Sequence, residues 1–108
     1  MTKALQILGL ARRAGAVAPG TTATRRSISQ GEARVVLMAE DASSTQLDKI
    51  RRTMRKRIIP QVLLGDRATL GAAIGKAPIT AVAVTNASLA GLLLESLDGE
   101  IMVDEGRD

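Results

Sequence analysis

The chain has 108 residues and a formal net charge of +4. This length is enough for one domain with a hydrophobic core but not for two. It contains no cysteine, histidine, tyrosine, tryptophan or phenylalanine. This composition excludes a disulfide framework, a thiolate metal site, acid–base catalysis by histidine and base stacking on aromatic side chains. We identify no signal peptide and no apolar stretch of about 20 residues, and therefore expect a soluble, cytoplasmic protein with no membrane partner.

Basic charge is concentrated in the first half of the chain. Residues 1–57 contain twelve Lys or Arg and four Asp or Glu, whereas residues 58–108 contain three and seven. The two halves therefore carry formal charges of +8 and −4. Such asymmetry is typical of a basic face that meets nucleic acid or an acidic membrane. Because eleven of the fifteen cations are arginine, recognition of phosphates and bases is favoured.

The first part of the chain predicts two helices joined by a short extended segment. The first helix covers residues 3–14 and ends at Gly15, which is a typical C-terminal glycine cap. Residues 16–19 are predicted to be extended. A second helix follows Gly20 and ends at Gly31.

The central part predicts a buried strand followed by an amphipathic helix. Residues 35–39 form a continuous apolar run, which is typical of a strand covered on both faces. Ser43 and Gln46 have the spacing of a capping box for a helix that reaches about Arg57. The apolar residues at helical spacing are Leu47, Ile50 and Met54.

Two further strands and one helix are predicted after this point. Residues 58–64 form a strand, and Pro60 must lie at its beginning or on an unpaired edge because proline has no N–H group. Asp66 caps a fourth helix. Residues 79–85 form another buried strand.

The last helix is capped by Asn86 or Ser88 and ends at Gly99, and residues 104–108 form an acidic, frayed tail. Residues 1–103 are therefore expected to form a single domain. Because the strands are separated by helices, the fold class is α/β, a three-layer α/β/α sandwich with a mixed, largely buried four-stranded sheet.

The helix led by Gly20 is the strongest candidate binding site, and it begins Gly20-Thr21-Thr22-Ala23-Thr24-Arg25-Arg26. A helix N-terminus presents free N–H groups and a partial positive charge, and glycine permits a close approach. Arg25 and Arg26 add forked donors for phosphate or for a guanine edge. The alternative interpretation is an ordinary solvated helix with a threonine N-cap.

A second basic surface is predicted on the third helix. Its polar side carries Lys49, Arg51, Arg52, Arg55, Lys56 and Arg57. A solvated face or a secondary phosphate contact is the favoured interpretation, because charged faces of amphipathic helices usually remain hydrated. A primary binding surface is the alternative.

Two patterns superficially resemble enzyme sites. Glu40 and Asp41 are paired carboxylates at the end of a central strand, but the sequence offers no neighbour that would shift their pKa values for catalysis. Asp41 is interpreted as a cap or turn former before the third helix. The glycines at Gly71 and Gly75 lack the spacing and the hydroxyl residue of a phosphate-binding loop, and we interpret them as permitting close helix packing and a helix end. We expect no catalytic residue, metal or cofactor.

Three separated motifs occur along the chain, at residues 8–15, 39–42 and 70–75. Together with the order of helices and strands, they make residues 3–97 resemble the L-seven-Ae/L-thirty-e ribosomal protein family, and its small bacterial branch in particular. The resemblance implies RNA binding, typically to a kink-turn, in which a bulge flanked by sheared G·A pairs bends an RNA duplex sharply.

In this family the second helix enters the widened groove, and a Gly-x-Asn-Glu-x-x-Lys motif at its start contacts guanine edges and the RNA backbone. Gly20 matches the glycine of the motif and Arg26 takes the lysine position. Thr22 and Ala23 replace the usual asparagine and glutamate. Two polar contacts to RNA are therefore weakened or lost, because threonine offers one hydroxyl and alanine offers nothing.

The loop at Lys76-Ala77-Pro78-Ile79 matches the second RNA-contacting loop of the family, and the resemblance implies that it presses a small apolar surface on an extruded base. The alternative is a plain connecting loop. The predicted RNA-binding residues are Gly20, Thr21, Thr22, Ala23, Arg25, Arg26, Glu40, Lys76, Ala77, Pro78 and Ile79.

The sequence therefore predicts a non-catalytic, monomeric, cytoplasmic protein that binds structured, kink-turn-like RNA, with ribosomal RNA among the candidate targets. The alternative function is a protein-interaction or assembly module that keeps the same fold without specific RNA readout.

Overall fold

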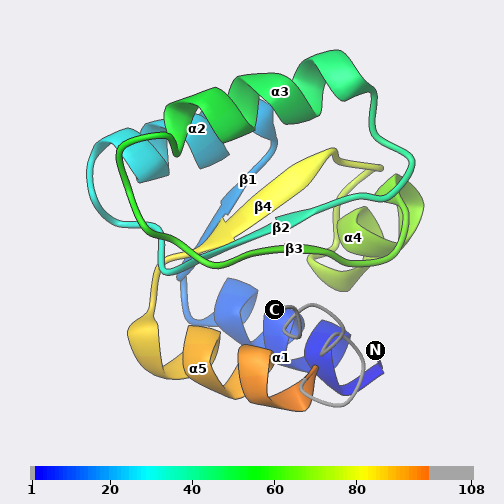
Figure 1. The fold of residues 1–108 in the computed structure, drawn as a ribbon. Helices are drawn as coiled ribbons and strands as arrows, with labels where there is room; N and C mark the ends of the chain where they lie inside the picture. Colours follow the sequence, from blue (N-terminus) through cyan, green and yellow to red (C-terminus); the bar gives the residue numbers. More distant parts are fainter. Residues whose placement is uncertain (1, 98–108) are drawn as a thin grey trace.

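The computed structural model describes residues 2–97, and within this range the chain forms five helices and four strands (Figure 1). Gly99 and the acidic tail lie outside the described residues. In chain order the elements are α1 (Thr2–Arg13), β1 (Val17–Pro19), α2 (Thr21–Ser29), β2 (Val35–Met38), α3 (Ser44–Thr53), β3 (Gln61–Leu63), α4 (Arg67–Ala73), β4 (Ala81–Val84) and α5 (Ala87–Ser96).

The four strands form one sheet in the order β1-β4-β2-β3. Strand β4 is antiparallel to both β1 and β2, whereas β2 and β3 are parallel. The two central strands are buried along their whole length, as expected for apolar runs that are covered on both faces. The predicted mixed, four-stranded sheet is confirmed.

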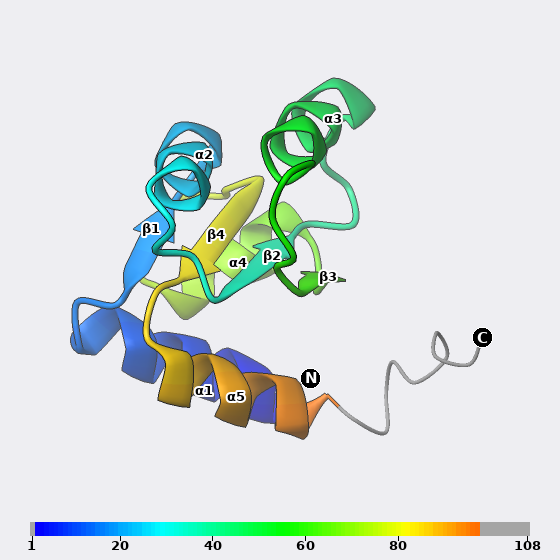
Figure 2. The ribbon, with the colours of Figure 1, turned by 60° about the vertical axis from the view of Figure 1, so that its left-hand side comes forward.

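Alternate residues of β2 point into two separate cores, one on each face of the sheet. Val35 and Leu37 pack in the core shared with α1, α4 and α5. Val36 and Met38 pack in the core beneath α2 and α3. The two layers of helices on opposite faces are clear in Figures 1 and 2, and they confirm the three-layer sandwich.

Side-chain caps begin α3, α4 and α5. The acceptor and donor pairs are Ser43 Oγ with the N–H of Gln46 (3.2 Å), Asp66 Oδ1 with that of Thr69 (2.8 Å), and Asn86 Oδ1 with that of Leu89 (2.9 Å). Asn86 rather than Ser88 is therefore the cap of the last helix. The hydrogen bonds from Thr69 also hold the pKa of the Asp66 carboxyl below its ordinary value.

Three predicted elements are clearly shorter in the structure, and one of them is β4, which covers Ala81–Val84 instead of residues 79–85. Helix α3 ends at Thr53, and residues 54–57 form a turn instead of its last helical turn. Strand β3 begins only after Pro60, whose missing N–H group cannot join a ladder. Ile58 lies before the strand and is completely exposed. Pro60 precedes an edge strand as predicted, and its carbonyl oxygen accepts a hydrogen bond from the Val36 N–H (3.0 Å).

Candidate nucleic-acid interface

Three segments from the predicted site meet at one end of the sheet. The Gly20 N–H donates to the Ala81 carbonyl (2.8 Å), and the Ala39 N–H donates to the Thr80 carbonyl (2.8 Å). These two bonds place the start of α2 and the turn that begins at Glu40 on either side of the chain entering β4. The loop at residues 76–79 therefore lies at the same end of the sheet as both of them.

Helix α2 begins at Gly20 without a side-chain cap. Gly20 has φ +92° and ψ 164°, a backbone conformation that only glycine adopts readily. A Cβ placed there would meet no described atom within 4 Å. The threonine N-cap considered from the sequence is therefore wrong, because glycine occupies the cap position and leaves the first-turn N–H groups without a side-chain acceptor.

The start of α2 is accessible to a ligand. Thr22 is exposed, and Thr21 and Ala23 are half-buried. The N–H groups of the first helical turn point away from the helix along its axis. Together with the positive end of the helix dipole, they form a small surface that is suited to a phosphate or to a carbonyl group of a base.

The buried side of α2 consists of small polar residues that sequence reasoning missed. Thr24 and Ser27 are buried with Ile28, and the Thr24 hydroxyl donates to the Ala18 carbonyl (3.2 Å). Ser27 Oγ is buried with no hydrogen-bond partner among the described residues. The spacing of these residues by three and four is a helical-face signal, obscured because only Ile28 is large and apolar.

The two adjacent arginines of α2 have different surroundings. Arg25 Nε donates to Thr53 Oγ1 on α3 (2.9 Å), and the Thr53 hydroxyl in turn donates to the Lys49 carbonyl (3.0 Å). Arg26 is exposed, and no hydrogen bond or ion pair to another described residue holds its guanidinium. The sequence predicted both arginines for the site, but it did not predict that Thr53 holds the Arg25 side chain through a hydrogen bond.

The loop at residues 76–79 folds back against α4. The Lys76 N–H donates to the Gly71 carbonyl (2.8 Å), and the Ile79 N–H donates to the Arg67 carbonyl (3.1 Å). A Cβ on Gly71 would collide with the Ala77 backbone. The close packing attributed to Gly71 is therefore with this loop rather than with another helix, and it holds residues 76–78 exposed at the surface.

The other glycine of this segment, Gly75, follows the end of α4 with φ +67°. This left-handed conformation is typical of a residue that terminates a helix. The predicted helix end at this glycine is therefore confirmed.

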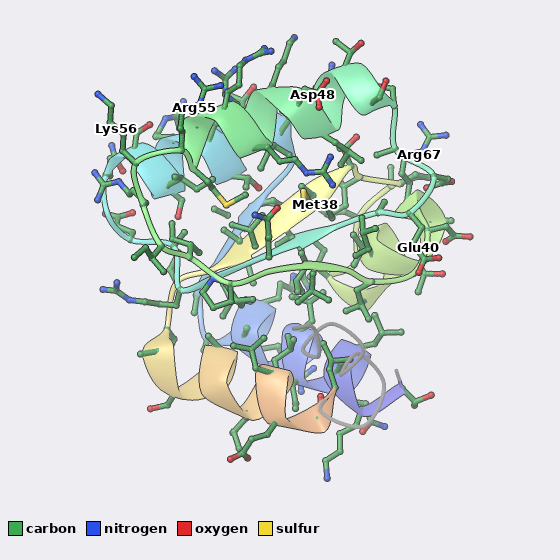
Figure 3. All side chains as sticks on the ribbon, viewed as in Figure 1. Met38, Glu40, Asp48, Arg55, Lys56 and Arg67 are labelled. Atoms are coloured by element: carbon green, nitrogen blue, oxygen red, sulfur yellow. The ribbon has the colours of Figure 1, made fainter. Side chains whose placement is uncertain are left out.

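The paired carboxylates have separate surroundings, and Asp41 has a structural contact. Asp41 Oδ1 accepts a hydrogen bond from the Arg67 N–H (2.8 Å), and Asp41 Oδ2 lies 3.6 Å from Arg67 Nε. Asp41 therefore supports the start of α4 and does not cap the third helix, but it does lie in the turn before that helix, as predicted. Ser43 caps that helix instead. Glu40 is exposed, and Figure 3 shows it at the same end of the molecule as Arg67.

The described residues form neither a metal site nor a membrane-spanning helix. In residues 2–97, no group of three or more acidic side chains is placed to hold a metal ion. In the same range, no helix is both long enough and apolar enough to cross a membrane.

Several known proteins are similar to this chain in sequence or in fold. The RNA-binding protein YlxQ of Bacillus subtilis (strain 168) is 37% identical over 92 residues, which cover 85% of this chain and 92% of the relative. A solved structure of a protein with unknown function from Bacillus halodurans C is 28% identical and has a TM-score of 0.84. That match covers 91% of this chain and 99% of the solved chain.

A second solved structure, the Giardia lamblia 15.5kD RNA binding protein, has a TM-score of 0.72 and covers 92% of this chain and 84% of its own. At 17% identity, this likeness shows the fold alone. The family model described as "Ribosomal protein L7Ae/L30e/S12e/Gadd45 family" matches residues 2–93. The resemblance identified from the sequence motifs is thus confirmed, and the chain belongs to this ribosomal protein family.

Proposed function

We propose that this chain binds structured RNA of the kink-turn type through the end of the sheet where α2 begins. The main support is the start of α2 at Gly20, which has no side-chain cap. Arg26 is exposed in the second turn of this helix, and the loop at residues 76–79 lies at the same end of the sheet. The name of the Bacillus subtilis relative, an RNA-binding protein, supports the same class of ligand.

The start of α2 and the loop at residues 76–79 contact different parts of the RNA in this proposal. The first-turn N–H groups of α2, with Arg25 and Arg26, bind RNA phosphates and the acceptor atoms of guanine edges. The exposed residues Ala77 and Pro78 form a small apolar surface for a base that the bent RNA extrudes. Glu40 lies at the edge of the site as an acceptor for base amino groups.

RNA shape and phosphate contacts provide most of the binding energy in this proposal. Thr22 and Ala23 stand where the family motif has an amide and a carboxylate, so direct readout of base edges is reduced. Phosphate contacts fix position without reading sequence. We therefore expect only a modest preference for a kink-turn over a plain RNA duplex.

The proposed activity is binding without catalysis. The chain acts as a monomer in the cytoplasm, and ribosomal RNA is the candidate target that the family name suggests. The basic half of the sequence, with twelve Lys or Arg among residues 1–57, attracts the RNA over a longer range than the direct contacts.

A salt titration with a kink-turn RNA tests the proposal. If about four phosphates are neutralised, the logarithm of the association constant falls with the logarithm of the salt concentration with a slope of about −3. Absence of measurable binding at low salt, or an affinity that does not change with salt, would contradict the RNA assignment and favour the protein-interaction module.

A further inference from the structure

A basic hollow lies at the opposite end of the sheet from the candidate interface. Its volume is about 310 Å³, and its lining includes the cations Arg34, Lys56 and Arg57. It is formed where α2 and α3 end and where β2 and β3 begin. In Figure 3, Lys56 lies at one end of α3, and Glu40 lies at the opposite end of the molecule.

Only one of the three cations has an evident structural role. Arg57 Nη2 donates to the Ser29 carbonyl at the end of α2 (2.9 Å). A cation beside a helix C-terminus is stabilised by the negative end of the helix dipole. Arg34 directly precedes β2 and belongs to neither α2 nor α3. Both Arg34 and Lys56 are exposed. No carboxylate of a described residue lies within 4.0 Å of either charged group.

The rim of the hollow is apolar as well as basic. Ile58 is completely exposed, and the neighbouring Ile59 is half-buried in the wall. Single exposed apolar residues are common on protein surfaces. Here, however, an isoleucine lies directly beside a cluster of cations, and a ligand that matches both has a negative charge and a flat apolar face. A nucleotide of an RNA strand has this combination.

The position of the hollow relative to the candidate interface also favours RNA. Helix α2 starts at the interface and ends at the hollow, and its nine residues span about 14 Å at about 1.5 Å per residue. At about 3.4 Å of duplex axis per phosphate of one strand, this distance corresponds to about four nucleotides of a duplex that runs parallel to α2. A strand that leaves the interface along α2 therefore reaches the hollow without a long detour.

We propose that this hollow is a second RNA subsite, in which Arg34 and Lys56 bind a phosphate and Ile58 lies against the base of the same nucleotide. The inference rests on the proposed function, because the strand is delivered by RNA bound at the start of α2. It adds a contact outside the kink-turn itself, and it predicts that affinity depends on the RNA that flanks the kink-turn.

Site-directed crosslinking tests the position of the strand. Because the chain contains no cysteine, Ile58→Cys introduces a unique thiol that can carry a photoreactive label. The matched control is Leu92→Cys on α5, since Leu92 is also exposed but lies in the opposite helical layer. With a kink-turn RNA extended by about ten nucleotides on each strand, the label at position 58 should crosslink to flanking nucleotides. Equal crosslinking from both positions would overturn the inference.

Affinity measurements test the two cations. Arg34→Gln combined with Lys56→Gln should weaken binding of the extended RNA by about tenfold and leave binding of the unextended kink-turn close to that of the control. The control is Arg51→Gln combined with Arg52→Gln, which removes the same charge from exposed positions of α3 outside the hollow. Equal losses for the two variants on the extended RNA would contradict the subsite.

Arg26→Ala separates failure of the subsite from failure of the proposed function. If the unmodified protein does not bind the unextended RNA, both the function and the subsite are wrong. If it binds and Arg26→Ala weakens that binding, but the Arg34 and Lys56 variant behaves like its control, only the subsite is wrong.

Discussion

Helices α2 and α3 cover the same face of the sheet (Figure 2), but they are stabilised in different ways. Helix α3 has the features expected of a stable amphipathic helix. Ser43 caps its first turn, and Leu47, Ile50 and Met54 fill the core beneath it. Burial of each such side chain contributes about 1.5–3 kcal/mol, so the basic residues on its outer side are not needed to hold the helix.

Helix α2 has fewer of these features. It begins at Gly20 without a side-chain cap, and the residues beneath it are Thr24, Ser27 and Ile28. Its buried face meets the small side chains of Ala81 and Ala83, which belong to the same core as Ile28.

This difference indicates which of the two helix starts is free to bind a ligand. A capped helix has its N-terminal N–H groups partly satisfied, whereas an uncapped helix leaves them for water or for an external acceptor. Basic charge is present on both helices, so charge alone does not distinguish them. What distinguishes them is the start of α2, which has no side-chain cap.

The largest expected effect comes from removing the arginines of α2. Arg25→Ala combined with Arg26→Ala should weaken binding of a kink-turn RNA by about 2–6 kcal/mol, because each positioned arginine contributes about 1–3 kcal/mol. Arg51→Ala combined with Arg52→Ala removes the same charge from α3 and should cost less, since distant exposed charges act through a screened field. Binding titrations at one salt concentration measure both. A larger loss for the α3 variant would place the primary surface on α3.

Substitutions at the two helix starts separate stability from binding. Ser43→Ala should lower the free energy of unfolding by about 1 kcal/mol through loss of the cap, and leave RNA affinity unchanged. Gly20→Ala should lower it by about 1–3 kcal/mol, because alanine is strained at φ +92°, and should also weaken RNA binding. Denaturant unfolding and RNA titration on the same samples check both effects. An equal loss of RNA affinity for Ser43→Ala and Gly20→Ala would contradict a binding site at the start of α2.

The features predicted correctly from the sequence depend on local chemistry. Asp66 and Asn86 bind N–H groups three residues ahead, so their role follows from spacing alone. Asp41 looked the same in the sequence, but its partner is Arg67, 26 residues further along. A cap between residues so far apart depends on how the sheet brings two turns together, and no local pattern reveals it.

The candidate site shows the same limit. The family motif located Gly20 and Arg26, because a motif is a local pattern. The hydrogen bond from Arg25 to Thr53 joins residues 28 positions apart on different helices, and neither residue carries a signal for the other. The proposed site residues were therefore named from local patterns, whereas the support that holds Arg25 required the structure.

This support leads to a smaller expected effect. Thr53→Val keeps the shape of the side chain but removes the oxygen that accepts from Arg25 Nε. Freeing Arg25 should weaken RNA binding by about 0.5–1.5 kcal/mol, the usual entropy cost of immobilising one long side chain. The same substitution made in an Arg25→Ala background should have no further effect if Thr53 acts only through Arg25. Additive losses would show that Thr53 affects binding by another route.

The smallest effect on affinity is expected where α2 departs from the family motif. Thr22→Asn combined with Ala23→Glu restores an amide and a carboxylate that can pair with guanine donors. Overall affinity should change little, because the added carboxylate also lies near phosphates, but discrimination between RNA structures should increase.

The measurement is the ratio of dissociation constants for a kink-turn RNA and for the same RNA with its G·A pairs converted to Watson–Crick pairs. It is made for both proteins at one salt concentration. We expect the unmodified protein to discriminate only modestly and the restored variant to discriminate more. If the unmodified protein already discriminates by more than about a hundredfold, or about 2.7 kcal/mol, then readout does not need the missing side chains. The open start of α2, with its N–H groups and arginines, would then provide specificity as well as affinity.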